Sequence, residues 1–413
     1  MCIDLKSFYA SVECAERGLD PFKINLVVAD KTRGQGAITL AATPAIKSLG
    51  VKSRGRLFEI PKDIECIIAK PRMSLYMEYS ARIYKIILKY ISSEDIYVYS
   101  IDECFIDATP YLKLYKLPIK ELAKLILKDI FDSTSITATV GIGTNLFLTK
   151  VALDITAKHV KDNIGYLDED IFKQTLWHHV PLTDFWMIGR GTTNRLNRLG
   201  IRDLYDLAHY DVNILQKVFG VNSRILYDHA WGKEDTTISD IKEYIPKGNS
   251  LSNSQILFED YNYEDALLVL REMVELNTLN MRKKHVVSNH ISLYIGYSKD
   301  IINPVNGSKK IDNTTNSNKI LTNEFVSLYK RIVNKNYPIR KIGISFSNIK
   351  DEYFEEYNLF VDQEKIEEER RIQDAFISIQ QKYGKNAVVK GYNLLDKATT
   401  IQRNKLIGGH NAR

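Results

Sequence analysis

The first 160 residues of the chain alternate short apolar runs with longer amphipathic patterns. The apolar runs at Leu26–Ala29, Ile96–Ile101 and Ile136–Ile142 are typical of strands, and residues 72–91 and 117–131 have the spacing of helices. This order predicts an α+β or α/β architecture for the N-terminal part of the chain.

Two further regions follow. Residues 181–231 predict a small all-helical domain, with short helices broken by Gly189, Gly191, Gly200 and Gly220. After a polar joint at 233–249 we expect a second sheet domain, with strands at Ser250–Phe258, Ser288–Tyr297 and Arg340–Phe346 and helices at Tyr263–Arg282, Thr322–Asn334 and Gln363–Tyr383. The Asn-, Ser-, Gly- and Lys-rich stretch Lys299–Lys319 predicts a mobile loop.

Composition excludes several classes of protein. With 413 residues and 44% apolar content, the chain can form several domains with their own cores, which excludes a disordered tail or a mini-protein. It contains neither a run of ~18 apolar residues nor a signal peptide, so we expect a cytoplasmic protein. The four cysteines are far apart, which disfavours a disulfide framework or a zinc site.

The net charge of +6 is concentrated in one segment. Residues 241–350 hold 16 basic and 10 acidic side chains. Such a concentration favours a polyanionic partner, although a solvated basic face is the alternative interpretation.

Three acidic residues could meet in space. Asp4 lies where a strand turns into a helix, and Asp102 and Glu103 lie between two apolar runs in a hairpin-like segment. Adjacent strand residues face opposite sides, so this pair converges only if the chain turns there. Three hard oxygen ligands suit Mg²⁺, and two such ions ~3.5–4 Å apart can activate a hydroxyl and hold leaving pyrophosphate. Taken alone, this pair is also typical of a solvated hairpin tip.

Three motifs in this order carry a family resemblance: D-L-K-S-F-Y-A-S-V-E from residue 4, S-I-D-E-C-F-I-D from residue 100, and T-V-G-I-G-T-N-L-F-L-T-K from residue 139. Together they resemble the Y-family translesion DNA polymerases of the UmuC-like, ImpB/MucB/SamB type. The resemblance implies an error-prone, template-directed DNA polymerase of DNA repair and the SOS response. It also implies primer-template DNA and dNTPs as partners and two Mg²⁺ ions as cofactors.

The resemblance implies an α+β, multidomain, right-hand fold. Its parts would be a ferredoxin-like palm (1–21 and 70–163), small fingers (22–69), a helix-hairpin-helix thumb (164–238), an α/β little finger (245–349) and a C-terminal tail (350–413).

The resemblance also assigns roles at the active site. Asp4, Asp102 and Glu103 would be catalytic metal ligands, joined by the backbone carbonyl of Leu5. Phe8 and Tyr9 would contact the nucleotide, with Tyr9 as the steric gate against ribonucleotides, although a core tyrosine is the alternative. The triphosphate would be bound by Lys47, where many members carry Arg, and by Lys158. Pro44 replaces the usual aromatic residue and puts base stacking in doubt.

DNA and clamp contacts complete the assignment. Gly189 and Gly191 would present helix N-terminal amides to a phosphate. The basic candidates for phosphate contacts in the little finger are Arg282, Lys283, Lys284, Arg340 and Lys341. Leu359 and Phe360 would anchor a sliding-clamp peptide, with Glu356 at the position of the usual Gln, although they could instead pack onto the domain.

Alternative hypotheses remain open. A catalytically silent DNA-binding scaffold of the same fold is one, and another palm-type nucleotidyl transferase is a second. Only three residues precede Asp4, fewer than the five or six that a central strand usually supplies, which is consistent with a truncated product or a later start codon.

Overall fold

The computed structural model describes residues 1–413 apart from 247, 299–300 and 355–362, and the side chain of residue 159. The chain forms two compact units, Met1–Tyr244 together with His410–Arg413, and Ile245–Gly409. In the part of the chain that is described, no helix is both long and apolar enough to cross a bilayer.

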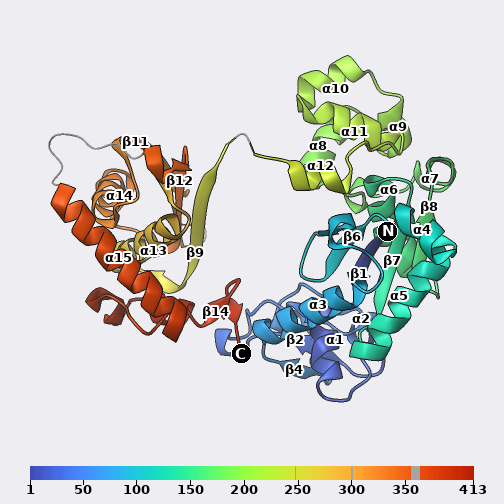
Figure 1. The fold of residues 1–413 in the computed structure, drawn as a ribbon, viewed down its shortest axis with the longest axis horizontal. Coiled ribbons are helices and arrows are strands. Elements are labelled where there is room, and N and C mark those ends of the chain that lie inside the picture. Colours follow the sequence, from blue (N-terminus) through green and yellow to red (C-terminus); the bar gives the residue numbers. More distant parts are fainter. Residues whose placement is uncertain (247, 299–300, 355–362) are drawn as a thin grey trace. The chain divides into compact units, whose positions relative to one another are not determined.

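A five-stranded sheet organises the first unit, and four of its strands are labelled in Figure 1. Its order is β5-β6-β1-β7-β8, and only β7 and β8 run parallel. The strand bounds are β1 Cys2–Leu5, β5 Ile96–Val98, β6 Glu103–Ile106, β7 Ala138–Gly143 and β8 Ile164–Leu167. Four residues are enough to place β1 at the centre of the sheet, where it pairs with both β6 and β7.

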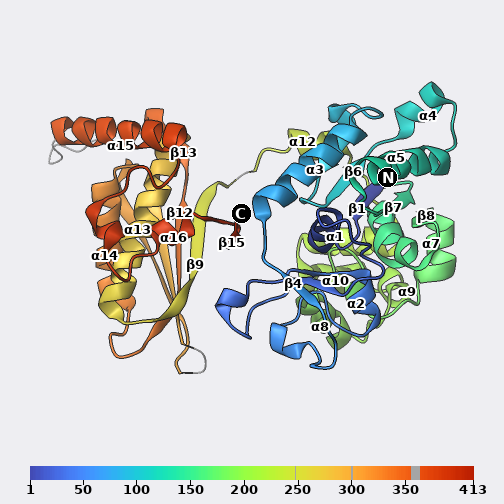
Figure 2. The same cartoon turned by 90° about the horizontal axis from the view of Figure 1, so that it is seen from below.

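Helices α3 (Met73–Ile87) and α5 (Ile119–Thr134) pack side by side in this unit (Figure 1 and Figure 2). Helix α6 (Leu146–Val151) and the π-helical turn that follows it approach β7 at Gly141 and Gly143. A Cβ at Gly141 would lie 2.2 Å from the Thr149 carbonyl oxygen, so only glycine allows this close packing.

Smaller elements complete the first unit. Strands β2, β3 and β4 form a separate sheet beside helices α1 and α2, and the segment after β8 is helical, as predicted for 181–231. Gly191 lies inside α8 and does not break it. The bounds are α1 Phe8–Ala15, β2 Leu26–Val28, β3 Ala41–Ala42, α2 Pro44–Ser48, β4 Ile67–Ala69, α4 Thr109–Tyr115, α7 Glu169–Leu176, α8 Arg190–Arg198, α9 Leu204–Ala208, α10 Val212–Phe219, α11 Asn222–Ala230 and α12 Ile238–Glu243.

An antiparallel sheet in the order β11-β10-β12-β9 organises the second unit. Alternate residues of β12, such as Ile342, Ile344 and Phe346, are buried against the helices, so one face of the sheet forms the core. The bounds are β9 Ser250–Tyr261, α13 Tyr263–Lys283, β10 Val286–Tyr297, β11 Val305–Thr315, α14 Asn318–Ile332, β12 Ile339–Ser347 and β13 Lys350–Asp351. Each strand and helix predicted here is present, although the helix predicted at Thr322–Asn334 begins at Asn318 and ends at Ile332.

The expectation of a loop over Lys299–Lys319 is wrong for most of that stretch. Residues Val305–Thr315 form β11, which pairs with β10 along the edge of the sheet. In this strand exposure alternates, and Val305, Gly307 and Lys309 are less exposed than their neighbours. The polar composition of the stretch gave no sign of this alternation. An edge strand with one solvent-facing side needs few apolar residues.

The described residues from 363 to 409 belong to the second unit. Helix α15 spans Gln363–Tyr383, as predicted, and packs on α13. Further on, the buried carboxylate of Glu272 accepts hydrogen bonds from the backbone N–H and hydroxyl of Thr399, at 2.7 and 2.9 Å. The chain ends with α16 (Thr400–Arg403), β14 (Leu406–Ile407) and β15 (His410–Asn411).

Candidate active site

The predicted carboxylates meet at one end of the first sheet. Asp4 lies directly opposite Glu103 in the β1–β6 register, and directly opposed residues point to the same face. Asp102 lies in the turn before β6, where the Ser100 hydroxyl donates to its carboxylate at 2.6 Å. The backbone N–H of Leu5 donates to the Asp102 carbonyl at 2.9 Å, which ties the two segments together.

The electrostatics of Asp4 reflect this crowding. Burial raises the pKa of Asp4 to about 7; Lys158 opposes this shift, while Asp102 and Glu103 reinforce it. Asp4 is therefore a partly buried acid whose charge is incompletely compensated by the chain itself.

A buried lysine holds one of these acids. Lys150 Nζ lies 2.8 Å from the Glu103 carboxylate and 2.9 Å from that of Asp154. Burial alone would lower the pKa of Lys150, but the two carboxylates outweigh it, so the net pKa is raised and the side chain stays charged. The Cys2 thiol also donates to Glu103, at 3.1 Å.

The chemistry of the donor set fits a divalent cation. Carboxylate oxygens are the ligands that Mg²⁺ prefers, and the uncompensated charge at Asp4 would be relieved by one. Within the described residues, however, no three His, Cys, Asp or Glu side chains form a ready-made metal cluster. In this structure Glu103 is instead paired with Lys150.

Two further lysines, Lys47 and Lys158, interact electrostatically with Asp4. Lys47 lies on α2 and donates to the Ser7 hydroxyl at 2.8 Å. Burial lowers the pKa of Lys47; Asp4 opposes this shift, and Lys158 and Lys6 add to it. Lys158 pairs with Asp154 at 2.8 Å. The structure thus places Lys47 and Lys158, both predicted from the sequence, close enough to Asp4 to interact with it electrostatically. Lys6 acts on Lys47.

The Tyr9 side chain is half-buried beside the acids. Its ring stacks on Tyr76, with centroids 4.5 Å apart and planes at 16°. Burial raises the pKa of Tyr9, Asp102 reinforces this shift, and Arg54 opposes it. Phe8 is buried next to it on α1, with its ring 5.7 Å from that of Tyr9.

The predicted glycines lie at a helix start. Gly189 is the N-cap of α8, and Gly191 is in the first turn. Among the described residues, no side chain caps this end, and a Cβ added at either glycine would have no neighbour within 4 Å.

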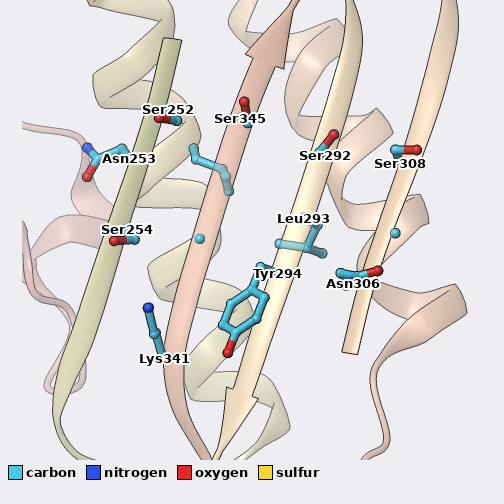
Figure 3. Close-up of a pocket in the computed structure, with 13 residues that line it drawn as sticks. Ser252, Asn253, Ser254, Ser292, Leu293, Tyr294, Asn306, Ser308, Lys341 and Ser345 are labelled. Atoms are coloured by element: carbon cyan, nitrogen blue, oxygen red, sulfur yellow. The ribbon is translucent and has the colours of Figure 1, made fainter. Parts of the chain in front are cut away.

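A second candidate surface is the helix-free face of the β11-β10-β12-β9 sheet (Figure 3). A row of four serines crosses all four strands in register, and Tyr294 and Lys341 lie beside it in a depression of about 630 Å³. The serines are Ser308, Ser292, Ser345 and Ser252. We call this surface the serine face. Its side chains are small and rich in hydrogen-bonding groups, so the backbone of a ligand can approach closely.

The predicted basic residues of this unit are not equivalent. Lys341 lies on the serine face, with its ammonium 5.2 Å from the centre of the Tyr294 ring. Arg340 pairs with Asp260 at 3.5 Å. Arg282 is mostly buried in ion pairs with Glu352 and Asp374.

The remaining predicted residues lie elsewhere. Lys283 and Lys284 are exposed at the C-terminal end of α13. Leu359 and Phe360 lie outside the described residues.

Several residues that contact the predicted site residues were not predicted from the sequence. Lys150 closes one of the family-like motifs, and Asp154 follows it by one helical turn, a spacing that could have indicated an ion pair. The contacts of Tyr76 and Glu13 depend on the packing of α1 against α3 and left no signal of their own.

Comparison with known proteins gives a consistent result. Residues 3–154 match the impB/mucB/samB family, and residues 249–359 match the C-terminal domain of that family. A protein of Bacillus subtilis (strain 168) named for UV-damage repair, UvrX, is 35% identical over 99% of this chain and 97% of its own length. DNA polymerase IV 2 of the same organism is 29% identical, with the same two coverages.

Solved structures share the fold. A Y-family DNA polymerase chimera of Dbh and Dpo4 superposes with a TM-score of 0.65 at 23% identity, covering 84% of this chain and 98% of the chimera. An insertion ternary complex of Dbh DNA polymerase gives 0.52 at 21% identity over the same shares.

Proposed function

Because the chain belongs to the impB/mucB/samB family of Y-family DNA polymerases, we propose that it is an error-prone, template-directed polymerase that extends primers past damaged bases. Its biological role would be DNA repair in an SOS-type response. The observation that carries the proposal is the convergence of Asp4, Asp102 and Glu103 with the surrounding lysines at one sheet end.

In this proposal the three carboxylates and the Leu5 carbonyl would hold two Mg²⁺ ions. Their binding would supply activation of the primer 3′-hydroxyl and stabilisation of the leaving pyrophosphate. Lys47 and Lys158 neutralise the triphosphate of the incoming dNTP as point charges, which orients it without the two-point grip of an arginine. The Tyr9 ring lies under the sugar and excludes a 2′-hydroxyl.

The duplex would be held independently of its sequence. The N-terminus of α8 at Gly189 and Gly191, which lacks a side-chain cap within the described part of the chain, would offer backbone N–H groups to one phosphate. The serine face and Lys341 would follow the backbone with hydroxyl donors and a cation. Arg340, Lys283 and Lys284 could add long-range attraction, whereas the ion pairs of Arg282 make it the weakest of the predicted contacts.

Primer extension tests the proposal. Asp102→Ala should abolish extension of a primer-template while leaving DNA binding unchanged, because this side chain lies at the acid cluster and not on the serine face. Asp107→Ala is a matched control from the end of the same hairpin; Asp107 is exposed and accepts from the Thr109 N–H at 2.9 Å. Undiminished extension by Asp102→Ala would refute the assignment. A parent chain that binds DNA but never extends it would favour the silent scaffold instead.

We also propose a sliding-clamp contact through Leu359 and Phe360. A short peptide ending in Leu and Phe can insert both side chains into an apolar pocket, and such anchors carry much of the energy of small interfaces. Leu359→Ala combined with Phe360→Ala should leave distributive extension unchanged and remove stimulation by a loaded bacterial clamp. Equal stimulation of both proteins would place any clamp contact elsewhere.

A further inference from the structure

The ring of Tyr9 has a rigid support behind it. Helix α1 carries Tyr9, and helix α3 carries Tyr76, whose side chain is completely buried. The near-parallel rings at 4.5 Å leave no space for another atom layer between them. Movement of the Tyr9 ring toward α3 therefore requires movement of Tyr76.

Tyr76 is itself held by a buried carboxylate. Its hydroxyl donates to Glu13 at 2.7 Å, and the Glu13 side chain is fully buried. Glu13 follows Tyr9 by one helical turn on α1, so both contacts with Tyr76 come from the same face of that helix.

Two arginines complete the arrangement. Arg72, at the start of α3, donates to both oxygens of Glu13 at 3.0 and 2.8 Å, and Arg17 donates to one of them. A carboxylate with this many charge-assisted bonds has one preferred position. It therefore fixes Tyr76, and Tyr76 limits where the Tyr9 ring can lie.

We propose that Tyr76 is a positioning residue for sugar selectivity, which keeps the Tyr9 ring from retreating when a ribonucleotide enters. The proposal rests on the polymerase function and on the gate role of Tyr9. The Tyr9 ring excludes a 2′-hydroxyl only if displacing the ring costs more free energy than the binding of the ribonucleotide releases. Close-packed interiors resist displacement, whereas a smaller residue at position 76 would leave space for the gate to recoil.

The test compares the ratio of kcat/KM for an rNTP to that for the matching dNTP. This ratio is unaffected by a loss of folded enzyme, because both substrates meet the same active fraction. Tyr76→Leu should raise the ratio by ~10-fold or more, equivalent to ~1.4 kcal/mol of lost discrimination. Tyr76→Phe retains the ring but loses the hydrogen bond to Glu13, so its ratio should lie between those of the parent and Tyr76→Leu.

Tyr79→Leu is the matched control. Tyr79 lies one turn further along α3, is also buried, and donates to Glu16 of α1 at 2.7 Å. It makes the same kind of interhelical contact one turn away from Tyr76, so its replacement should leave the ratio unchanged.

The double variant, Tyr9→Ala with Tyr76→Leu, distinguishes a failure of the positioning role of Tyr76 from a failure of the gate role of Tyr9. If Tyr76 acts through the gate, Tyr76→Leu should add nothing to the ratio already raised by Tyr9→Ala. A raised ratio for Tyr9→Ala with a parent ratio for Tyr76→Leu overturns the positioning role and leaves the polymerase proposal intact. Independent, additive effects would also overturn it. An unchanged ratio for Tyr9→Ala removes the gate itself, and the positioning role fails with it.

Discussion

Removing one partner of the buried ion pair between Lys150 and Glu103 should strongly destabilise the first unit. Both side chains are more than nine-tenths buried, with exposed fractions of 8% and 9%. Lys150→Met would keep an apolar stem of similar size and remove the cation. Glu103 would retain the Cys2 thiol as a hydrogen-bond donor, and Asp154 would retain Lys158.

The expected loss follows from this geometry. Removing one partner of a buried ion pair costs ~3–5 kcal/mol of unfolding free energy, because it leaves an uncompensated charge. We expect the lower end, ~3 kcal/mol, since the Asp154 side chain is 26% exposed and keeps a second partner.

Urea unfolding followed by tryptophan fluorescence measures this loss. All three tryptophans, Trp177, Trp186 and Trp231, lie in the first unit, so their emission reports on that unit alone. With an m-value of ~3 kcal/mol/M, the midpoint should fall by ~1 M urea in buffer containing EDTA. Lys124→Met is the control, because Lys124 and its partner Glu121 are both 52% exposed; its midpoint should match the parent.

A second variant tests the cause. Adding Glu103→Gln to Lys150→Met removes the uncompensated charge, and part of the lost stability should return. An unchanged midpoint for Lys150→Met, or a double variant no more stable than the single one, would contradict the role assigned to this buried ion pair.

Three other expectations follow from particular contacts. Gly141→Ala should lower the same urea midpoint by an amount equivalent to ~3 kcal/mol or more, because its Cβ would meet the backbone of Thr149 at 2.2 Å, whereas Gly36→Ala, with no neighbour within 4 Å, should not. Lys341→Ala should reduce the slope of log DNA affinity against log salt by about 1, whereas Lys309→Ala, whose ammonium pairs with Glu324, should change it less. Burial would raise the pKa of Glu13, but hydrogen bonds from Arg72, Tyr76 and Arg17 outweigh it and lower the pKa below 4.5. Its stabilising contribution is therefore complete above about pH 4.5 and lost as the pH falls through the folded pKa, so the stability of Glu13→Gln should vary less than the parent's between about pH 5 and 3.

The local pattern of apolar and polar residues was sufficient to predict most helices and strands of the fold. Helix α15 occupies the predicted range Gln363–Tyr383, and α13 begins at Tyr263 as its periodicity indicates. The hairpin that carries Asp102 and Glu103 was also predicted, because these two acids separate two apolar runs that pair as antiparallel strands. These features depend on residues close together in the chain, and side-chain periodicity records such relations directly.

Contacts between distant segments were decided only by the tertiary structure. Strand β11 is polar enough to resemble a loop and becomes a strand because β10 supplies its hydrogen-bonding partners. The phosphate-contact prediction for Arg282 rested on its charge, and the structure places that charge in ion pairs with Glu352 and Asp374. Lys150 reaches Glu103 only because glycines in β7 let α6 approach closely, and Tyr76 supports Tyr9 only because α1 packs on α3. Sequence carries the chemistry of each side chain, but its partner is set by backbone clearance and register, which no single segment encodes.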